Sequence, residues 1–274
     1  MMRMMRMMRM MRRMAAALAA TVMMTGSFGL AGQAGAVLYG DFPAPDGSLT
    51  WTGVEDDSGR LGTPAATSTG LYFAEVGIAS SCSSASCTAE QSFTNEGLAL
   101  EIQAGSGFGL DLLVITLEGV ISASASGADM AIANVSSSVF IDIFDVDGVA
   151  INQINVSAPM LFRLTGDPAA TPTEGFVFDA SGAAADSGGD LAWTGEIAID
   201  LADVLTANAV TGSVSRIGVG LSTSLSSFAT GSGSAAGSVA TLLISPNVVP
   251  EPGLALLMAF GLAALALRKS DRGS

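Results

Sequence analysis

Short runs in which apolar and polar residues alternate recur along the middle of the chain. Three of them are Leu98–Gln103, Gly195–Leu201 and Arg216–Leu221. Successive side chains of a strand point to opposite faces, so this period of two buries one face and leaves the other in water. Gly, Ser, Asp and Pro separate the runs, as turns require. The pattern predicts an all-β domain, an antiparallel β-sandwich with a jelly-roll-like arrangement.

The rest of the region refines this expectation. Leu110–Leu117 is more continuously apolar, which predicts a central strand, and Leu201–Leu205 predicts one or two helical turns. The Ser-, Gly- and Ala-rich stretch 222–238 predicts a long loop or a flexible tether, because such sequences behave as flexible chains. We therefore expect one β-sandwich domain at 37–244, followed by a linker at 245–249.

The segment 145–148 (DVDG) separates two apolar runs, residues 139–144 and 149–156. An acidic, glycine-containing segment between such runs predicts a β-hairpin, with Gly148 supplying the positive φ of the turn.

The same carboxylates raise an alternative, a calcium site. Asp142, Asp145 and Asp147 offer oxygen ligands of the kind that calcium prefers. The full spacing of an EF-hand loop is absent, however. We therefore expect a hairpin without a metal, and keep these three residues as candidate ligands.

Two tryptophans lie in similar segments, LTWTG at 49–53 and LAWTG at 191–195. Trp51 and Trp193 each share a strand face with a leucine two residues earlier. This pattern predicts burial in the core rather than an exposed platform for stacking sugars. The echo is too short to establish a duplication.

The charge pattern excludes several function classes. The chain has 25 acidic and 11 basic residues and no histidine. Between residues 37 and 249 the basic residues are Arg60, Arg163 and Arg216. Such a surface repels nucleic acid, and without imidazole neither a Ser-His-Asp triad nor a His-ligated metal site can form. We expect no enzymatic activity and no cofactor, although glycoside hydrolysis needs only two carboxylates and stays an open alternative.

The two cysteines, Cys82 and Cys87, form a C-x4-C pair. In an exported protein this spacing predicts a local disulfide. A redox-active pair would have the spacing C-x-x-C, and zinc would need two further ligands.

The N-terminal part predicts a signal peptide, residues 1–36. A methionine- and arginine-rich start precedes an apolar stretch at Met14–Met24, and small residues follow. Ala34 and Ala36 form an A-x-A cleavage site. We expect a signal helix, export through the Sec translocon, and cleavage by signal peptidase that leaves Val37 as the first residue.

The C-terminal part, residues 250–274, carries a different signal. Pro250, Glu251 and Pro252 hold an extended, exposed peptide, since proline fixes φ and disfavours helix before it. Residues 253–267 carry no charge and predict a transmembrane helix of about 22 Å, short of the roughly 30 Å of a membrane core.

A basic cluster closes the sequence. Arg268, Lys269 and Arg272 follow the apolar helix directly. Positive charge beside a membrane span favours the cytoplasmic side, so we expect the β-domain on the opposite side.

The order of these parts resembles the PEP-CTERM sorting signal: VPEP at 249–252, an apolar helix at 253–267, then basic residues. The resemblance implies a membrane-anchored precursor that an exosortase processes at the PEP motif. It also implies delivery to the cell surface or extracellular matrix of a Gram-negative-type bacterium, often one that makes exopolysaccharide.

The middle of the chain resembles an uncharacterised family of PEP-CTERM ectodomains. That resemblance implies a fold and a location but no activity. The matching segments are GDF (40–42), LTWTGVEDDS (49–58), LYF (71–73), GLALEIQA (97–104), ITLEG (115–119), LAWTGEIAIDL (191–201) and the serine-rich stretch 215–244.

These observations predict an exported surface or matrix protein without catalytic activity, with exopolysaccharide as a partner. The alternative is a carbohydrate- or calcium-binding surface module.

Overall fold

A computed structural model describes residues 35–83, 87, 91–126, 129–165, 171–179 and 190–250. The chain divides into two units, 1–34 and 35–274, and the described residues all belong to the second. The predicted signal helix, the transmembrane helix and the basic cluster lie outside the described residues. Among the described residues, no helix is long and apolar enough to cross a membrane.

Strands dominate the described part, where one short helix accompanies them. The strands are β1 (Val37–Pro43), β2 (Leu49–Asp56), β3 (Pro64–Ala66), β4 (Leu71–Phe73), β5 (Ala79–Ser83), β6 (Gln91–Ala104), β7 (Phe108–Ser124), β8 (Ala131–Val146), β9 (Val149–Pro159), β10 (Leu161–Leu164), β11 (Phe176–Asp179), β12 (Leu191–Asp200), β13 (Val214–Ala229) and β14 (Ser234–Pro250), and the helix is α2 (Leu201–Ala207).

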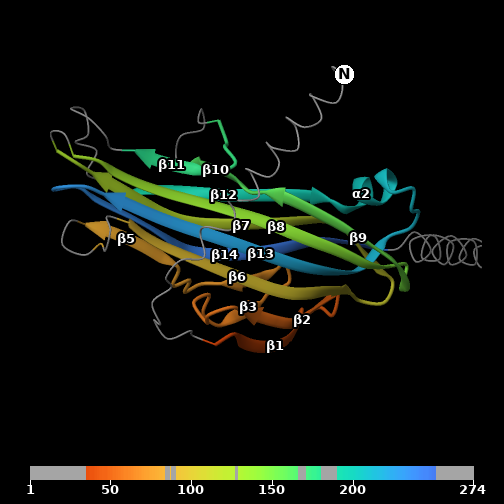
Figure 1. Ribbon diagram of the computed structural model, residues 1–274. Coiled ribbons are helices and arrows are strands. Elements are labelled where there is room, and N and C mark those ends of the chain that lie inside the picture. Colours follow the sequence, from red (N-terminus) through yellow and green to blue (C-terminus); the bar gives the residue numbers. More distant parts are fainter. Residues whose placement is uncertain are drawn as a thin grey trace, which may run out of the picture. The chain divides into compact units, whose positions relative to one another are not determined.

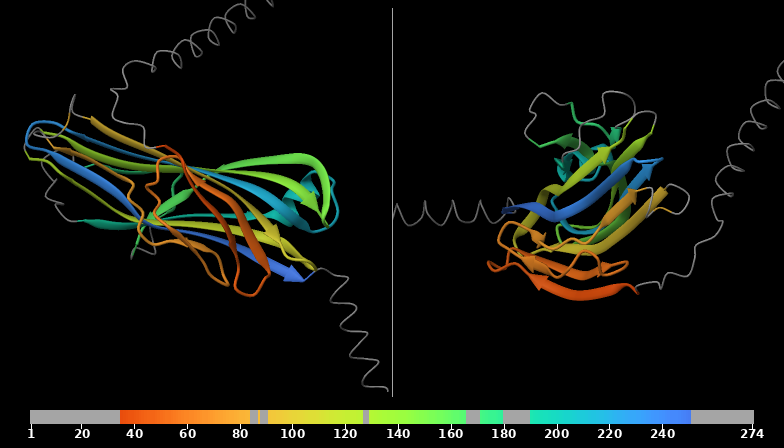
Figure 2. Two further views of the ribbon diagram at one scale, coloured as in Figure 1. Left: turned by 90° about the horizontal axis from the view of Figure 1, so that it is seen from below. Right: turned by 90° about the vertical axis from the view of Figure 1, so that its left-hand side faces the viewer.

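The strands form two layers that are continuous through one corner. The first layer has the order β1-β2-β6-β13-β8-β9, and the second has β3-β4-β14-β7-β12-β10. The layers join where Val214 of β13 pairs with both Leu110 of β7 and Val146 of β8. Neighbouring strands are antiparallel throughout these pairings, and the long strands lie side by side (Figures 1 and 2). The predicted all-β, antiparallel sandwich is confirmed.

The core lies between the layers and follows the alternation in the sequence. Along β13 every second residue is buried, from Ile217 to Ala229. Trp51 and Trp193 are buried at 0% and 1% exposure, and the ring of Trp193 packs edge-on against Phe162 at 5.6 Å. The prediction that both tryptophans belong to the core is confirmed.

Two predicted connections are strands instead. The serine-rich stretch 222–238 forms the second half of β13, a turn and the start of β14. Its small residues conceal a period of two, in which Thr223, Leu225, Ser227 and Ala229 are buried, whereas Ser222, Ser224, Ser226 and Phe228 lie on the outer face. The expected linker at 245–249 continues β14, where Ser245 pairs with Val114 and Val249 pairs with Gly109. The folded domain therefore reaches Pro250.

Three smaller predictions are confirmed. Residues 110–117 lie in β7, a central strand between β14 and β12. The predicted helical turns form α2, which begins after Asp200, whose carboxylate accepts a hydrogen bond from the backbone N–H of Asp203 at 2.8 Å. Cys82 and Cys87 form the expected disulfide.

Candidate functional site

The outer face of β8 carries a row of large side chains. Phe140, Asp142 and Phe144 alternate with the buried Val139, Ile141 and Ile143, so all three project away from the core. Phe140 is 50% exposed. A phenyl ring left half in water on a regular sheet is an apolar surface available to a ligand.

Beside this row, β13 presents glycines instead of side chains. Gly218 pairs with Asp142, and Gly220 pairs with Phe140. A Cβ at Gly218 would come within 3.0 Å of the Phe144 ring, so the glycine allows the ring to lie down over the strand. The two glycines form the floor of a groove whose wall is the aromatic row of β8.

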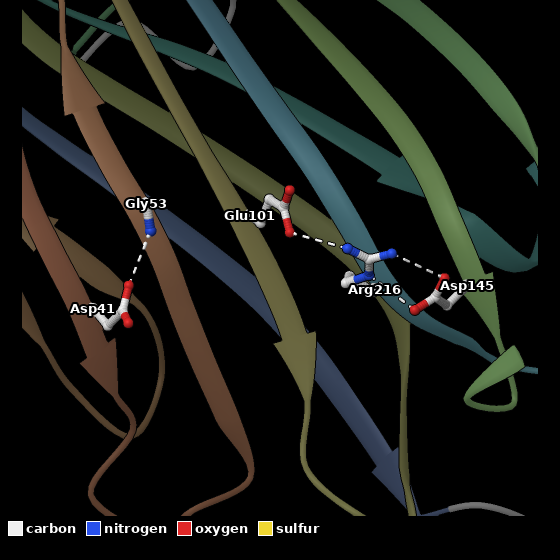
Figure 3. Close-up of polar contacts among 5 residues, drawn as sticks. All are labelled: Asp41, Gly53, Glu101, Asp145 and Arg216. Carbon is white, nitrogen blue, oxygen red and sulfur yellow. Dashed lines mark hydrogen bonds and ion pairs between the residues drawn. The ribbon is translucent and has the colours of Figure 1, made fainter. Parts of the chain in front are cut away.

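The groove continues across β6 to β2. Its remaining lining includes Ala99 and Glu101 of β6 and Thr52 and Gly53 of β2, and its volume is about 540 Å³. Gly53 has φ of 59° in an irregular part of β2, and its N–H donates a hydrogen bond to Asp41 of β1 at 3.1 Å (Figure 3). The outer face of four adjacent strands thus builds one open trough.

An ion-pair network lies beside this trough (Figure 3). Arg216 donates from Nε and Nη2 to the two carboxylate oxygens of Asp145, at 2.8 and 3.2 Å. Its Nη1 lies 3.3 Å from Glu101 Oε2. The guanidinium also lies over the ring of Phe144, 5.1 Å from its centroid. One arginine therefore ties together β13, β8 and β6 and fixes the orientation of Phe144.

Asp142 stands apart from this network. Within the described part of the chain, its carboxylate has neither a hydrogen-bond donor nor an ion-pair partner, and it is half-buried among the groove residues. With Glu101 it gives the groove two carboxylates, of which one shares Arg216 with Asp145.

The three candidate calcium ligands are not brought together. Asp145 is held by Arg216, whereas Asp147 accepts a hydrogen bond from the backbone N–H of Ser213 at 2.8 Å. Asp147 and Gly148 form the two-residue turn of the predicted hairpin, with φ of 50° and 73°. The hairpin is confirmed. No group of three or more carboxylate or thiol side chains suited to a metal occurs in the described ranges.

A second carboxylate pair lies inside the domain, away from the groove. Asp56 and Glu96 are 0% and 2% exposed. Burial works against ionisation of Asp56, but hydrogen bonds from the backbone N–H groups of Leu61 and Ser58 outweigh it and lower the pKa of Asp56. Asp56 also accepts a hydrogen bond from the hydroxyl of Tyr39 at 3.2 Å.

Glu96 behaves in the opposite way. Burial raises its pKa to about 7, and the adjacent negative charge of Asp56 adds to the rise, although a hydrogen bond from the Ser58 hydroxyl opposes it. The pair thus tends to hold one proton near neutral pH. Neither residue lines the groove, so this proton is not presented to a ligand there.

Apart from Asp142, which was a candidate calcium ligand, the groove residues were not predicted from the sequence. The predicted strands do contain Phe140, Gly218 and Gly220. These residues stand at the alternate positions whose side chains face water. Phenylalanine and paired glycines are unusual at such outward positions, where serine occupies several of the neighbouring sites. This exception to the pattern was the signal available in the sequence.

No family model and no curated protein matches the chain. Similar solved structures include a xylan-binding module, CBM15, with 15% identity, 61% of this chain and 90% of that chain covered, and a TM-score of 0.16. The CBM22-1–GH10 modules of an endo-1,4-β-D-xylanase from Clostridium thermocellum match with 9% identity, coverage of 62% and 27%, and a TM-score of 0.16.

A third similar structure is the catalytic domain of an endo-1,3-β-glucanase from Thermotoga petrophila. It matches with 7% identity, coverage of 66% of this chain and 77% of that chain, and a TM-score of 0.18. At these TM-scores the likenesses carry no argument about what this chain binds.

Proposed function

We propose that this protein is an exported surface or matrix protein whose β-sandwich binds a polysaccharide chain in the groove over β2, β6, β13 and β8. The observation that carries the proposal is the half-exposed Phe140 ring beside the glycine floor of Gly218 and Gly220. A sugar ring has an apolar C–H face and a rim of hydroxyl groups. An aromatic wall with a few polar groups at its edge matches both parts.

The dimensions of the trough support a chain-like ligand. It crosses four strands, and strands are spaced about 4.8 Å apart, so its length from β2 to β8 is about 14 Å. Glu101 and Asp142 offer hydrogen-bond acceptors, and Thr52 offers a hydroxyl. The open shape suits a polymer that enters and leaves at both ends.

Export and processing at both ends complete the proposal. The first strand begins at Val37, directly after the A-x-A cleavage site at Ala34 and Ala36. The last strand ends at Pro250, the first residue of the PEP motif. Cleavage at either point would leave the paired strands intact. The disulfide between Cys82 and Cys87 agrees with an oxidising compartment.

We propose binding rather than hydrolysis at the groove. The carboxyl group with the strongly raised pKa, Glu96, is sealed in the interior and could not protonate a leaving group in the trough. Glu101 is engaged by Arg216. Asp142 then acts as a contact for the ligand and not as half of a catalytic pair.

Affinity electrophoresis of the exported protein, in gels containing surface polysaccharide extracted from its host, tests this proposal. We expect retardation of the natural protein and loss of retardation in Phe140→Ala. Phe93→Ala is the matched control, because Phe93 is a 59% exposed phenyl group on β6 that does not line the groove. Equal migration of the two variants would reject the groove as the binding site.

A further inference from the structure

We propose that the groove selects polysaccharides that carry free amino groups, and that Asp142 is the residue that binds the ammonium. This inference rests on the proposed function and specifies its ligand class.

The position of Asp142 leaves its carboxylate open to the groove. It lies between Phe140 and Phe144 on the same face of β8, opposite Gly218, so no side chain covers it from β13. Its carboxylate is without a hydrogen-bond or ion-pair partner in the described ranges. An ionised group in such a site gains most from a ligand that brings a positive charge.

The charges in and beside the groove are mainly negative. Arg216 lies beside the groove, and its guanidinium is shared between Asp145 and Glu101. Together with Asp142, three carboxylates accompany one guanidinium, which leaves an excess of negative charge. The surrounding domain strengthens this field, because the other arginines between residues 37 and 249 are Arg60 and Arg163.

Two phenyl rings, Phe140 and Phe144, flank Asp142 on the outer face of β8. Arg216 already lies over the face of Phe144 at 5.1 Å, so one ring of the row is occupied by a cation. The exposed ring of Phe140 is the equivalent surface at the other side of Asp142. An amino sugar that stacks on Phe140 presents its C–H face to the ring and its ammonium to Asp142.

The same features disfavour other polymers. A polysaccharide rich in uronic acid would bring negative charge to an acidic groove and be repelled. A fully N-acetylated or neutral polysaccharide keeps the stacking contact but loses the ion pair. A basic peptide shares the positive charge, and it is therefore included as a competitor in the test.

The test compares two oligosaccharides of the same length and linkage by isothermal titration: hexamers of glucosamine and of N-acetylglucosamine, below the pKa of the sugar amine. Short oligomers reduce the non-specific attraction of a long polycation to an acidic protein. We expect the free-amine hexamer to bind about tenfold more tightly, as one partly buried ion pair allows. Asp142→Asn should remove this tenfold preference, because it weakens binding of the free-amine hexamer more than binding of the acetylated hexamer.

Asp203→Asn is the matched control, because Asp203 is an exposed carboxylate on α2, outside the groove. It removes the same charge and should keep the preference. Equal binding of both hexamers by the natural protein would overturn the inference and leave the proposed function intact. Binding of neither hexamer, together with loss of retardation by the host polysaccharide, would reject both. Stronger competition by a lysine hexapeptide than by the free-amine hexamer would reject the amino-sugar assignment.

Discussion

Arg216 and Asp145 face each other across the β13–β8 pair and form two hydrogen bonds, at 2.8 and 3.2 Å, beside a bulge in the register. The planar guanidinium matches the carboxylate at both oxygens, whereas a lysine ammonium presents a single point charge. The side chains are 35% and 19% exposed, so water weakens the pair.

We therefore expect Arg216→Lys to lower the free energy of unfolding by about 1 kcal/mol and to release the Phe144 ring. Urea unfolding and the aromatic NMR signals of Phe144 measure the two effects. Arg163→Lys on β10 is the control, and it should change neither. An unchanged Phe144 signal in Arg216→Lys would contradict the role of the arginine in fixing the groove wall.

Substitution of Gly119 tests the packing of the buried Trp193 over β7. A Cβ on Gly119 of β7 would collide with the backbone oxygen of Ser238 and with the indole ring of the buried Trp193. We expect Gly119→Ala to cost about 3 kcal/mol, the upper end for overpacking. At Gly237 the added Cβ would make an ordinary contact, 3.5 Å from Leu225, so Gly237→Ala should be near neutral. Similar midpoints for the two variants in thermal unfolding would contradict the described packing.

The buried pair of Glu96 and Asp56 predicts a pH-dependent stability. The pKa of Glu96 rises from its ordinary 4.5 to about 7 in the folded protein, so the folded state holds a proton that the unfolded state releases. The stability from this proton is fully present below the unfolded pKa and is lost as pH rises through about 7. Between pH 5 and 8 we expect a loss of about 2 kcal/mol.

Glu96→Gln mimics the protonated side chain and should flatten this decline when unfolding is followed at several pH values. The lowered pKa of Asp56 has the opposite effect on stability. It stabilises the folded state at higher pH, and this contribution is lost as the pH falls. A decline that is as steep in Glu96→Gln as in the natural protein would assign the proton to another group.

The disulfide predicts a modest stabilisation. Cys82 and Cys87 close a loop with a sequence separation of 5. Removing such a short loop constraint costs about 2 kcal/mol in the chain-entropy model. Cys82→Ser with Cys87→Ser should unfold at correspondingly lower urea, and a reductant should lower the stability of the natural protein to the same level. A reductant that leaves the midpoint of the natural protein unchanged would contradict this contribution.

Processing at both ends is tested by the intact mass of the protein from membranes and from the medium. We expect an extracellular species that begins near Val37 and ends near Pro250, and we expect alanine at Pro250, Glu251 and Pro252 to abolish its release. A protein that is found only in membranes and still carries Arg268 to Ser274 would identify a permanent anchor instead.

The sequence predicted the sheets because alternation is a local signal. The strand that contains Leu98–Gln103, the 145–148 turn and the two buried tryptophans were all predicted from a few neighbouring residues. Residues 222–238 were misread as a loop because serine and glycine are read as flexible. Their strand depends on pairing with β6 and β8, which are distant in sequence.

The groove was harder to predict for the same reason. Phe140 and Gly220 become neighbours only through the register of β8 and β13. The contact of Arg216 with Glu101 likewise depends on the pairing of β13 with β6. Local patterns cannot supply such a register, because each strand is compatible with several partners.

The most direct test of the groove as the polysaccharide-binding site is NMR mapping of the bound polysaccharide. The backbone amide signals of the protein are recorded while oligosaccharides from the host polysaccharide are added to saturation. We expect shifts concentrated at Gly218, Gly220, Phe140 and Asp142, with little change on β12 and β14. Saturable binding whose shifts fall on the second layer, with the groove signals unmoved, would contradict this expectation.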